Sequence, residues 1–153
     1  VLDRAWRDLD IHGTPLRLGG LYDYAFALDD RNSCDPDRMD PEVCRFLTDF
    51  QDTERFTLML SHRPDSFALG EAARTWSIDL VLSGHAHGGQ VVLPVLGGVF
   101  GGDLGLFSPY LHGMCRKDGL TMAVTSGLGS QRERLPRFHN PPEIMVIDLT
   151  PES

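Results

Sequence analysis

The sequence lacks several features that mark other classes of protein. It contains no apolar run long enough to cross a bilayer, no internal repeat and no low-complexity tract. It is also short of basic residues, with 14 lysines and arginines against 22 aspartates and glutamates and a net charge of −8. General nucleic-acid binding and binding to anionic membranes need a basic surface, so this composition argues against both. The 153 residues suffice for one hydrophobic core, and we expect a single domain over residues 1–153.

Cysteine is scarce as well. Cys34, Cys44 and Cys115 are odd in number and have no zinc-finger spacing, so we interpret them as free thiols in a reducing compartment. We therefore expect a cytoplasmic location. The chain begins with Val1 rather than Met and has no signal-like start, so we expect it to be part of a longer protein. Attachment to the cytoplasmic face of the membrane would depend on a segment upstream of Val1.

Hydrophobic periodicity predicts an α/β fold. Alternating or short apolar runs predict strands at residues 1–13, 16–21, 56–60, 79–82, 90–95, 120–125 and 144–149. One helix is predicted to start at Asp40-Pro41, because an N-cap residue precedes a proline and the apolar stripe Val43, Phe46, Leu47 and Phe50. A second is predicted from Pro64-Asp65 with the stripe Leu69, Ala72, Ala73 and Trp76, and residues 29–39 and 97–109 are predicted loops. This order predicts a sheet with a parallel and an antiparallel portion.

The stretch Ser83–Gln90 is the strongest functional signal. It follows an apolar strand and holds His85 and His87 two residues apart, and in extended backbone such a pair points both rings the same way. The glycines at 84, 88 and 89 allow backbone angles closed to other residues and a close approach to a ligand. His62 follows the strand at 56–60 in the same manner, although alone it would be interpreted as an ordinary polar contact. We expect the three imidazoles at one sheet edge as ligands of a divalent metal.

These residues resemble a known family. Ser61-His62-Arg63-Pro64-Asp65 and Ser83-Gly84-His85-Ala86-His87-Gly88-Gly89-Gln90 resemble the last two metal-binding blocks of the calcineurin-like metallophosphoesterases. One bacterial branch also has segments similar to three others in this chain: 18–23, 126–129 with 135–138, and 142–144. The resemblance covers most of residues 15–149. It implies a four-layer α/β/β/α sandwich with mixed sheets, of which this chain would supply about one sheet and part of the other.

The resemblance also implies an activity. It implies hydrolysis of a phosphomonoester, phosphodiester or pyrophosphate by two divalent ions (Mn, Fe, Zn or Co), on a small molecule or a lipid-linked phosphate. His62 and His85 would ligate one ion and His87 the other. Arg137 would contact a phosphate oxygen of the substrate. Pairing of Arg137 with Glu133 or Glu143 on the surface is an equally good interpretation. The loops at 97–113 and 130–141 would set selectivity.

Three earlier blocks of the family are missing from this sequence in their order: Asp-x-His, Gly-Asp-x-x-Asp, and Gly-Asn-His-Asp or Glu. Asp10-Ile11-His12 matches the first by letters, but it lies too close to His62, and we interpret it as a chance match. No catalytic acid or base is therefore assigned. We expect the chain to be the C-terminal portion of such an enzyme, to bind one ion or fewer, and to be inactive alone. An uncovered apolar face would make it marginally stable or self-associating.

Other interpretations differ in what they require. The alternative from another class is a non-catalytic metal-binding or interaction domain with an incomplete site. Amidohydrolases place His-x-His after a strand but need a barrel downstream, and too little chain follows His87 to form one. Metallo-β-lactamase-like hydrolases need an aspartate where this sequence has Gly89, which excludes them.

Overall fold

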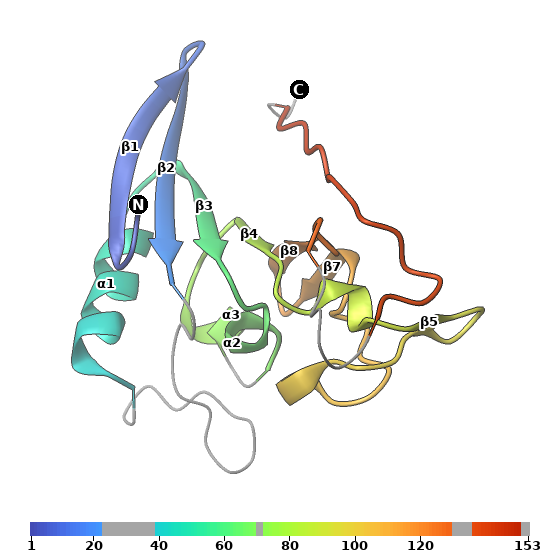
Figure 1. Cartoon of the computed structure of the whole chain (residues 1–153). Helices are drawn as coiled ribbons and strands as arrows, with labels where there is room; N and C mark the ends of the chain where they lie inside the picture. The colour runs from blue at the N-terminus through green and yellow to red at the C-terminus, as the bar shows by residue number, and fades with distance from the viewer. Residues whose placement is uncertain (23–38, 70–71, 130–135, 151–153) are drawn as a thin grey trace.

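One mixed sheet organises the fold. The computed structural model describes residues 1–22, 39–69, 72–129 and 136–150, and its main sheet has the strand order β1-β2-β3-β4-β8-β7. The strands are β1 (Ala5–Ile11), β2 (Thr14–Leu21), β3 (Phe56–Ser61), β4 (Leu80–Ser83), β7 (Gly113–Lys117) and β8 (Leu120–Val124). Strands β2, β3, β4 and β8 are parallel, whereas β1 and β7 pair antiparallel at the two edges (Figure 1). The predicted α/β class is confirmed.

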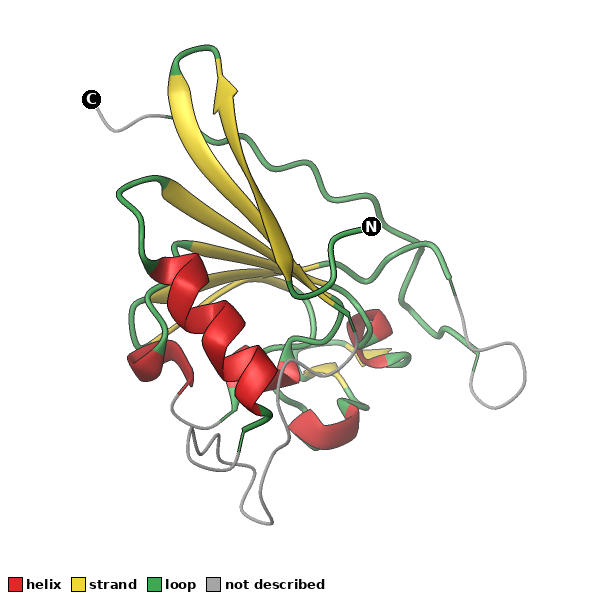
Figure 2. Cartoon of the chain, turned by 90° about the vertical axis from the view of Figure 1, so that its left-hand side faces the viewer, coloured by secondary structure: helices red, strands yellow, loops and turns green. Residues whose placement is uncertain are grey.

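Helices cover one face of this sheet (Figure 2). Helix α1 (Pro41–Gln51) begins as predicted, because the Asp40 side chain accepts a hydrogen bond from the Glu42 N–H at 2.8 Å. The apolar stripe predicted for α1 is buried, and Phe50 is wholly inaccessible. Helix α1 packs with α2 (Asp65–Ala68) and α3 (Ala72–Thr75) against the side chains on this face of the sheet. Strands β3, β4 and β8 contribute Met59, Val81 and Met122. This face holds the main core.

The other face of the sheet has a thinner cover. Its buried cluster comprises Leu16, Leu58, Leu80 and Ala123. Residues Met145 and Ile147 of the C-terminal segment pack against this cluster, while Leu60 on the same face is 40% exposed. The described residues therefore form two layers, one of helices and one sheet. The four-layer sandwich stays a prediction.

Three predicted elements differ in the structure. Residues 144–149 form no strand. The side chains of Met145 and Ile147 pack on the sheet, but the backbone of the segment does not join its hydrogen-bond ladder. The second predicted helix is present as α2 and α3, with residues 70 and 71 between them outside the described residues. The predicted strand at 90–95 is reduced to β5 (Val92–Leu93), which pairs with β6 (Gly97–Gly98), and the predicted loop at 97–109 also contains a 3₁₀ turn, η3 (Gly102–Leu104).

Strand β7 was not predicted. Its hairpin with β8 turns at Asp118-Gly119, where both residues have positive φ, at 49° and 93°. An Asp-Gly pair is a strong signal for a two-residue hairpin turn. That signal could have found β7.

Some expectations lie outside the described residues. These are the Asp23 end of the 18–23 motif, most of the 29–39 loop, Cys34, Glu133, and residues 130–135 of the basic loop. Cys44 and Cys115 are free thiols, as predicted. Among the described residues, no helix has the length and apolarity needed to cross a membrane.

Candidate metal centre

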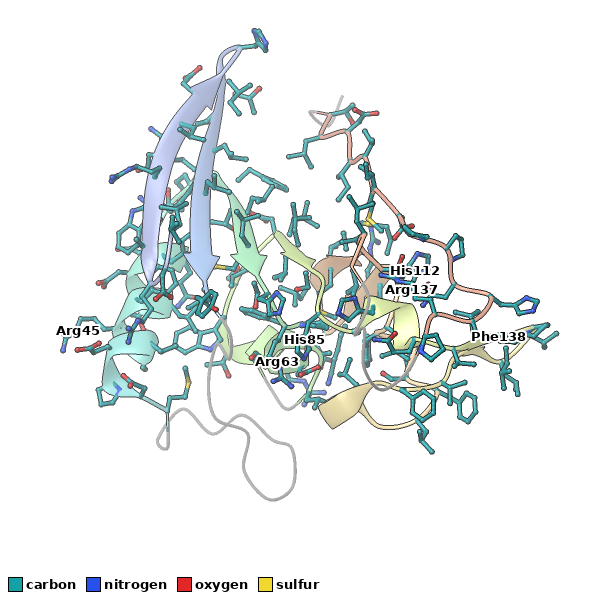
Figure 3. The ribbon with its side chains drawn as sticks, viewed as in Figure 1. Arg45, Arg63, His85, His112, Arg137 and Phe138 are labelled. Atoms are coloured by element: carbon teal, nitrogen blue, oxygen red, sulfur yellow. The ribbon has the colours of Figure 1, made fainter. Side chains whose placement is uncertain are left out.

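Two of the predicted metal-ligating histidines meet at the carboxyl edge of the sheet. Because β3 and β4 are parallel neighbours, His62 and His85 follow them at the same edge. The Gly84 N–H donates to the His62 carbonyl at 3.2 Å, which continues the pairing of the two segments beyond the strands. His62 Nε2 and His85 Nδ1 lie 3.1 Å apart, and the ring centroids are 4.9 Å apart at 74°. At this distance one ring nitrogen donates a hydrogen bond to the other. His85 is labelled in Figure 3.

This pair of nitrogens suits a divalent ion. Imidazole nitrogens bind zinc-like ions at roughly 2.0–2.1 Å, and two nitrogens 3.1 Å apart can both reach one ion at that distance. Within residues 1–22, 39–69, 72–129 and 136–150, however, there is no group of three or more His, Cys, Asp or Glu side chains that could hold a metal. Of the three predicted ligands, His62 and His85 therefore lie together, and His87 is not gathered with them.

The backbone of the histidine loop is not extended as predicted. His85 and His87 have φ values of 62° and 48°, and Gln90 has 60°. Residues His87–Gly89 form a 3₁₀ turn, η2. Left-handed backbone costs about 1–2 kcal/mol for a residue other than glycine, so neighbouring contacts must hold it. The two rings are therefore not oriented by an i, i+2 alternation of extended backbone.

Two of the three glycines have the predicted backbone angles, and their close neighbours are other residues of the chain. At Gly88 a Cβ would lie 2.9 Å from Asn140 Oδ1, and at Gly89 one would lie 2.8 Å from Gly98 Cα. Both also have positive φ, so glycine is required at both positions. Gly84 meets neither condition, because a Cβ there would meet only Thr125 Cγ2, at 4.0 Å.

Burial and neighbouring cations favour neutral rings at His85 and His87. The pKa of His85 is lowered, first by burial and then by the positive charge of Arg63. The pKa of His87 is also lowered by burial and then by Arg137. Neutral imidazole is the form that ligates metals, so both side chains are in the ligating form at neutral pH.

A buried ion pair supports the His62 loop. Arg63 contacts the Asp65 carboxylate through Nε at 2.9 Å and through a terminal nitrogen at 2.8 Å. The Asp65 side chain is almost wholly buried at the start of α2. Such a pair is costly to break, because one buried charge would lose its partner. The pair therefore fixes the segment immediately after His62.

Arg137 lies beside His87, but its guanidinium is already bound by the protein. It donates to the carbonyls of Ser126, Gly127 and Gly129 and to Asn140 Oδ1. One terminal nitrogen lies 3.4 Å from His87 Nδ1. The alternative pairing with Glu143 is not seen, because Glu143 pairs with His112 at 2.8 Å. Arg137 thus lies near the site with its guanidinium bound by backbone carbonyls, and its contact with substrate stays a prediction.

The contacts of two further groups near the site were not predicted from the sequence. Asn140 is buried and donates to the His87 carbonyl at 2.6 Å and the Gln90 carbonyl at 3.2 Å. Glu143 accepts from the Ser126 N–H at 2.9 Å, and this bond, with His112, lowers its pKa to about 2. No sequence spacing links Asn140 to Gln90, 50 positions away, so only the fold could show that contact.

The histidine block also contains buried polar atoms without partners. Among the described residues, Ser83 Oγ and Gln90 Oε1 are inaccessible and make no hydrogen bond. Such atoms are rare in folded proteins and call for an explanation. Both belong to the Ser83–Gln90 block, so the two orphaned atoms are at the proposed site.

Two cavities adjoin the histidine loops. One of about 320 Å³ lies beside His62 and is lined by Leu60 and Leu82 from the thinly covered sheet face. Another of about 620 Å³ lies beside Gly88 and is lined by His112 and by residues of the predicted selectivity loops. The site is therefore open on two sides.

The chance match at Asp10-Ile11-His12 lies at the opposite edge of the sheet. It belongs to the end of β1 and its turn into β2, where Asp10 Oδ1 accepts from the Gly13 N–H at 2.9 Å. Because β1 runs antiparallel to β2, this turn is remote from the carboxyl end of β2. The carboxylate closes a hairpin turn.

The fold and site define an α/β domain with a histidine pair suited to a divalent ion. The chain is 33% identical over 144 residues to an uncharacterized metallophosphoesterase of Helicobacter pylori J99, covering 94% of this chain and 34% of the relative. It is 38% identical over 96 residues to the uncharacterized metallophosphoesterase YkuE of Bacillus subtilis, covering 61% of this chain and 31% of the relative. A second Helicobacter pylori metallophosphoesterase, from strain 26695, is 31% identical over 144 residues. No family model matches the chain, and no solved structure matches it significantly.

These relatives place the chain in the metallophosphoesterase family, which confirms the family predicted from its motifs. The chain spans about a third of the length of the curated relatives that it matches.

Proposed function

We propose that this chain carries the C-terminal ligands of a binuclear metallophosphoesterase centre. The convergence of His62 Nε2 and His85 Nδ1 to 3.1 Å, in a relative of metallophosphoesterases, carries the proposal. His62 and His85 would hold one divalent ion, of Mn, Fe, Zn or Co, and His87 would bind the second. When bound, such ions polarise a phosphoryl group and supply a nucleophile at neutral pH.

The residues of this chain have defined tasks in that proposal. His62 and His85 hold their ring nitrogens in place through the parallel pairing of β3 and β4. The buried Arg63–Asp65 pair supports the first loop. The cavity of about 620 Å³ beside Gly88 would receive the leaving group of a phosphomonoester, a phosphodiester or a pyrophosphate. The substrate would be a small phosphate ester or a lipid-linked phosphate.

The remaining ligands would come from sequence upstream of this chain. That sequence would supply the second sheet and cover Leu60 and Leu82, which flank both the second face and the cavity beside His62. Alone, the chain would bind one ion or fewer, lack hydrolase activity, and associate through this apolar face. A cytoplasmic location, free or at the membrane face, completes the proposal.

A second candidate is a metal-binding or interaction domain without catalysis. It is favoured by the lack of any group of three metal-ligating side chains among the described residues. The two candidates differ in what happens when the natural upstream sequence is restored. Hydrolysis should then appear only for the enzyme.

The test is hydrolysis of bis(p-nitrophenyl) phosphate with added Mn²⁺, by the chain alone and by the chain with its upstream sequence restored. We expect activity only in the longer protein, and its loss in His85→Ala. The matched control is His12→Ala, which removes an imidazole at the opposite sheet edge and should leave activity unchanged. An inactive long protein that still binds metal would favour the second candidate, and activity of the chain alone would contradict the half-site.

A further inference from the structure

The segment that follows Pro136 lies across the histidine loop. The Phe138 N–H donates to the Gln90 carbonyl at 3.1 Å, and the Val92 N–H donates to the Phe138 carbonyl at 2.9 Å. Asn140 Nδ2 donates to the His87 and Gln90 carbonyls, at 2.6 Å and 3.2 Å. The carbonyls of His87 and Gln90, at the two ends of the glycine turn, therefore accept hydrogen bonds from the same buried amide.

The turn needs such support. Residues 87, 88, 89 and 90 all have positive φ, at 48°, 62°, 81° and 60°. His87 and Gln90 are not glycine, so positive φ costs each of them about 1–2 kcal/mol. Strained backbone of this kind persists only where the surroundings over-determine it. Asn140 holds both ends of the turn, and its side chain occupies the space that a Cβ at Gly88 would need.

Arg137 extends the same contacts to the loop after β8. Its guanidinium donates to the carbonyls of Ser126, Gly127 and Gly129 and to Asn140 Oδ1, while one terminal nitrogen lies 3.4 Å from His87 Nδ1. A planar fork with five donors can satisfy several carbonyls at once, which an ammonium group cannot do with the same geometry. Moving Arg137 onto a substrate phosphate would remove this donor from the Ser126 and Gly129 carbonyls, whereas the Gly127 carbonyl also accepts from the Glu143 N–H at 3.0 Å.

We propose that Asn140 and Arg137 form a clamp that holds the left-handed turn at 87–90 and sets the direction of the His87 ring. Both act as positioning residues: Asn140 through the backbone of the turn, and Arg137 through Asn140 and the ring itself. This assignment replaces the predicted contact between Arg137 and substrate. It rests on the proposed function only in that the ring being positioned is a metal ligand. The clamp itself is a property of the turn.

The test uses the whole chain without metal, with amide hydrogen exchange and ¹⁵N spectra of the histidine rings. In Asn140→Ala, exchange of the Gln90 and Phe138 amide protons should accelerate roughly tenfold or more, because the turn loses both amide bonds. The ring signals of His87 should shift or broaden, and those of His62 should not. A role confined to global stability would instead accelerate exchange throughout the sheet.

Arg137→Lys is the second variant, since it keeps the charge and the fold but loses the planar fork. It should shift the His87 ring signals, whereas the matched control Arg116→Lys on β7 should not. Unchanged His87 ring signals and unchanged Gln90 exchange in both clamp variants would overturn the clamp.

Zn²⁺ titration of the same variants separates the clamp from the proposed function. If the wild-type chain binds Zn²⁺ through its histidines, Asn140→Ala should weaken the shift that Zn²⁺ causes at His87 more than the shift at His62. If the wild-type chain shows no Zn²⁺ shift at any histidine, metal binding by the histidines of the chain alone fails, while the metal-free exchange data still decide on the clamp.

Discussion

The two faces of the sheet differ in how they are covered. One face packs against α1, α2 and α3, and its core side chains Phe50, Met59 and Val81 are wholly inaccessible. Among the described residues, the other face has a small buried cluster against which Met145 and Ile147 pack, and Leu60 is 40% exposed there. Because adjacent residues of one strand point to opposite faces, the same strand contributes to a full core and to a partial one.

This difference shows where the site lies in relation to the rest of a larger molecule. Strands β3 and β4 place His62 and His85, and helices cover one face of these strands. The cavity beside His62 opens at the second face, next to Leu60 and Leu82. A domain that completed the second face would also border the histidines. The proposed missing ligands and the exposed apolar surface therefore have one explanation.

Neighbouring substitutions on β3 should show the largest effect. We expect Met59→Ala to lower the free energy of unfolding by about 3 kcal/mol, because it removes a wholly buried side chain and leaves a cavity. Leu60→Ala, one residue along, should cost less than about 1 kcal/mol, because its side chain is already partly exposed. Urea unfolding of both variants measures this. Equal losses would mean that the two faces are covered alike.

The covering segment should depend on the ionised form of Glu143. The pKa of this carboxyl is lowered to about 2, first by the Ser126 N–H and then by His112, from an ordinary value of 4.5. A carboxyl whose pKa is lowered by folding stabilises the folded state at pH values above its ordinary pKa. The contribution of Glu143 is therefore complete above pH 4.5 and is lost as the pH falls toward 2.

Glu143→Gln tests that dependence. It should cost about 1–2 kcal/mol at pH 7 and flatten the loss of stability below pH 4.5. Glu42→Gln on α1 is the control: its pair with Arg4 is exposed, and the change should stay within about 0.5 kcal/mol. Urea unfolding at pH 7 and at acid pH measures both. An acid transition of unchanged size in Glu143→Gln would show that this carboxylate does not hold the segment.

Leu60→Lys should have the smallest effect on stability but a clear effect on self-association of the chain. We expect the wild-type chain to associate as its concentration rises, because an exposed apolar face attracts a second one. Leu60→Lys should reduce this association with little change in the unfolding of the monomer, whereas Leu9→Lys, on the edge strand β1, should reduce it less. Sedimentation velocity measures association, and a wild-type monomer at all concentrations would contradict a self-associating face.

Local signals predicted most of the fold. The N-cap at Asp40 and the stripe of α1 are confirmed, and so are the apolar runs that became β2, β3, β4 and β8. The alternation at 144–149 predicted a strand, and it was right about which side chains face the sheet but wrong about backbone pairing. Met145 and Ile147 do face the sheet, but alternation reports which side chains are buried and not whether a neighbouring strand pairs with the backbone.

The site was predicted in its residue types and less well in its geometry. The convergence of His62 and His85 follows from parallel strand order, which periodicity indicates. The left-handed turn at His87 could not be predicted, because contacts with Asn140 and Arg137, far along the chain, hold it. The predicted contact of Arg137 with substrate rested on its place in a basic loop near this edge and on the planar fork of its guanidinium. The carbonyls that bind the guanidinium are visible only in the fold.

The most direct test of the histidine site is the metal content of the untagged chain, measured by elemental analysis beside a His85→Ala, His87→Ala double variant. The account predicts one ion or fewer per wild-type chain, and none in the double variant, because a pair of imidazoles supplies only part of a coordination sphere. Two tightly held ions would contradict the half-site. Metal content unchanged in the double variant would contradict the histidine centre itself.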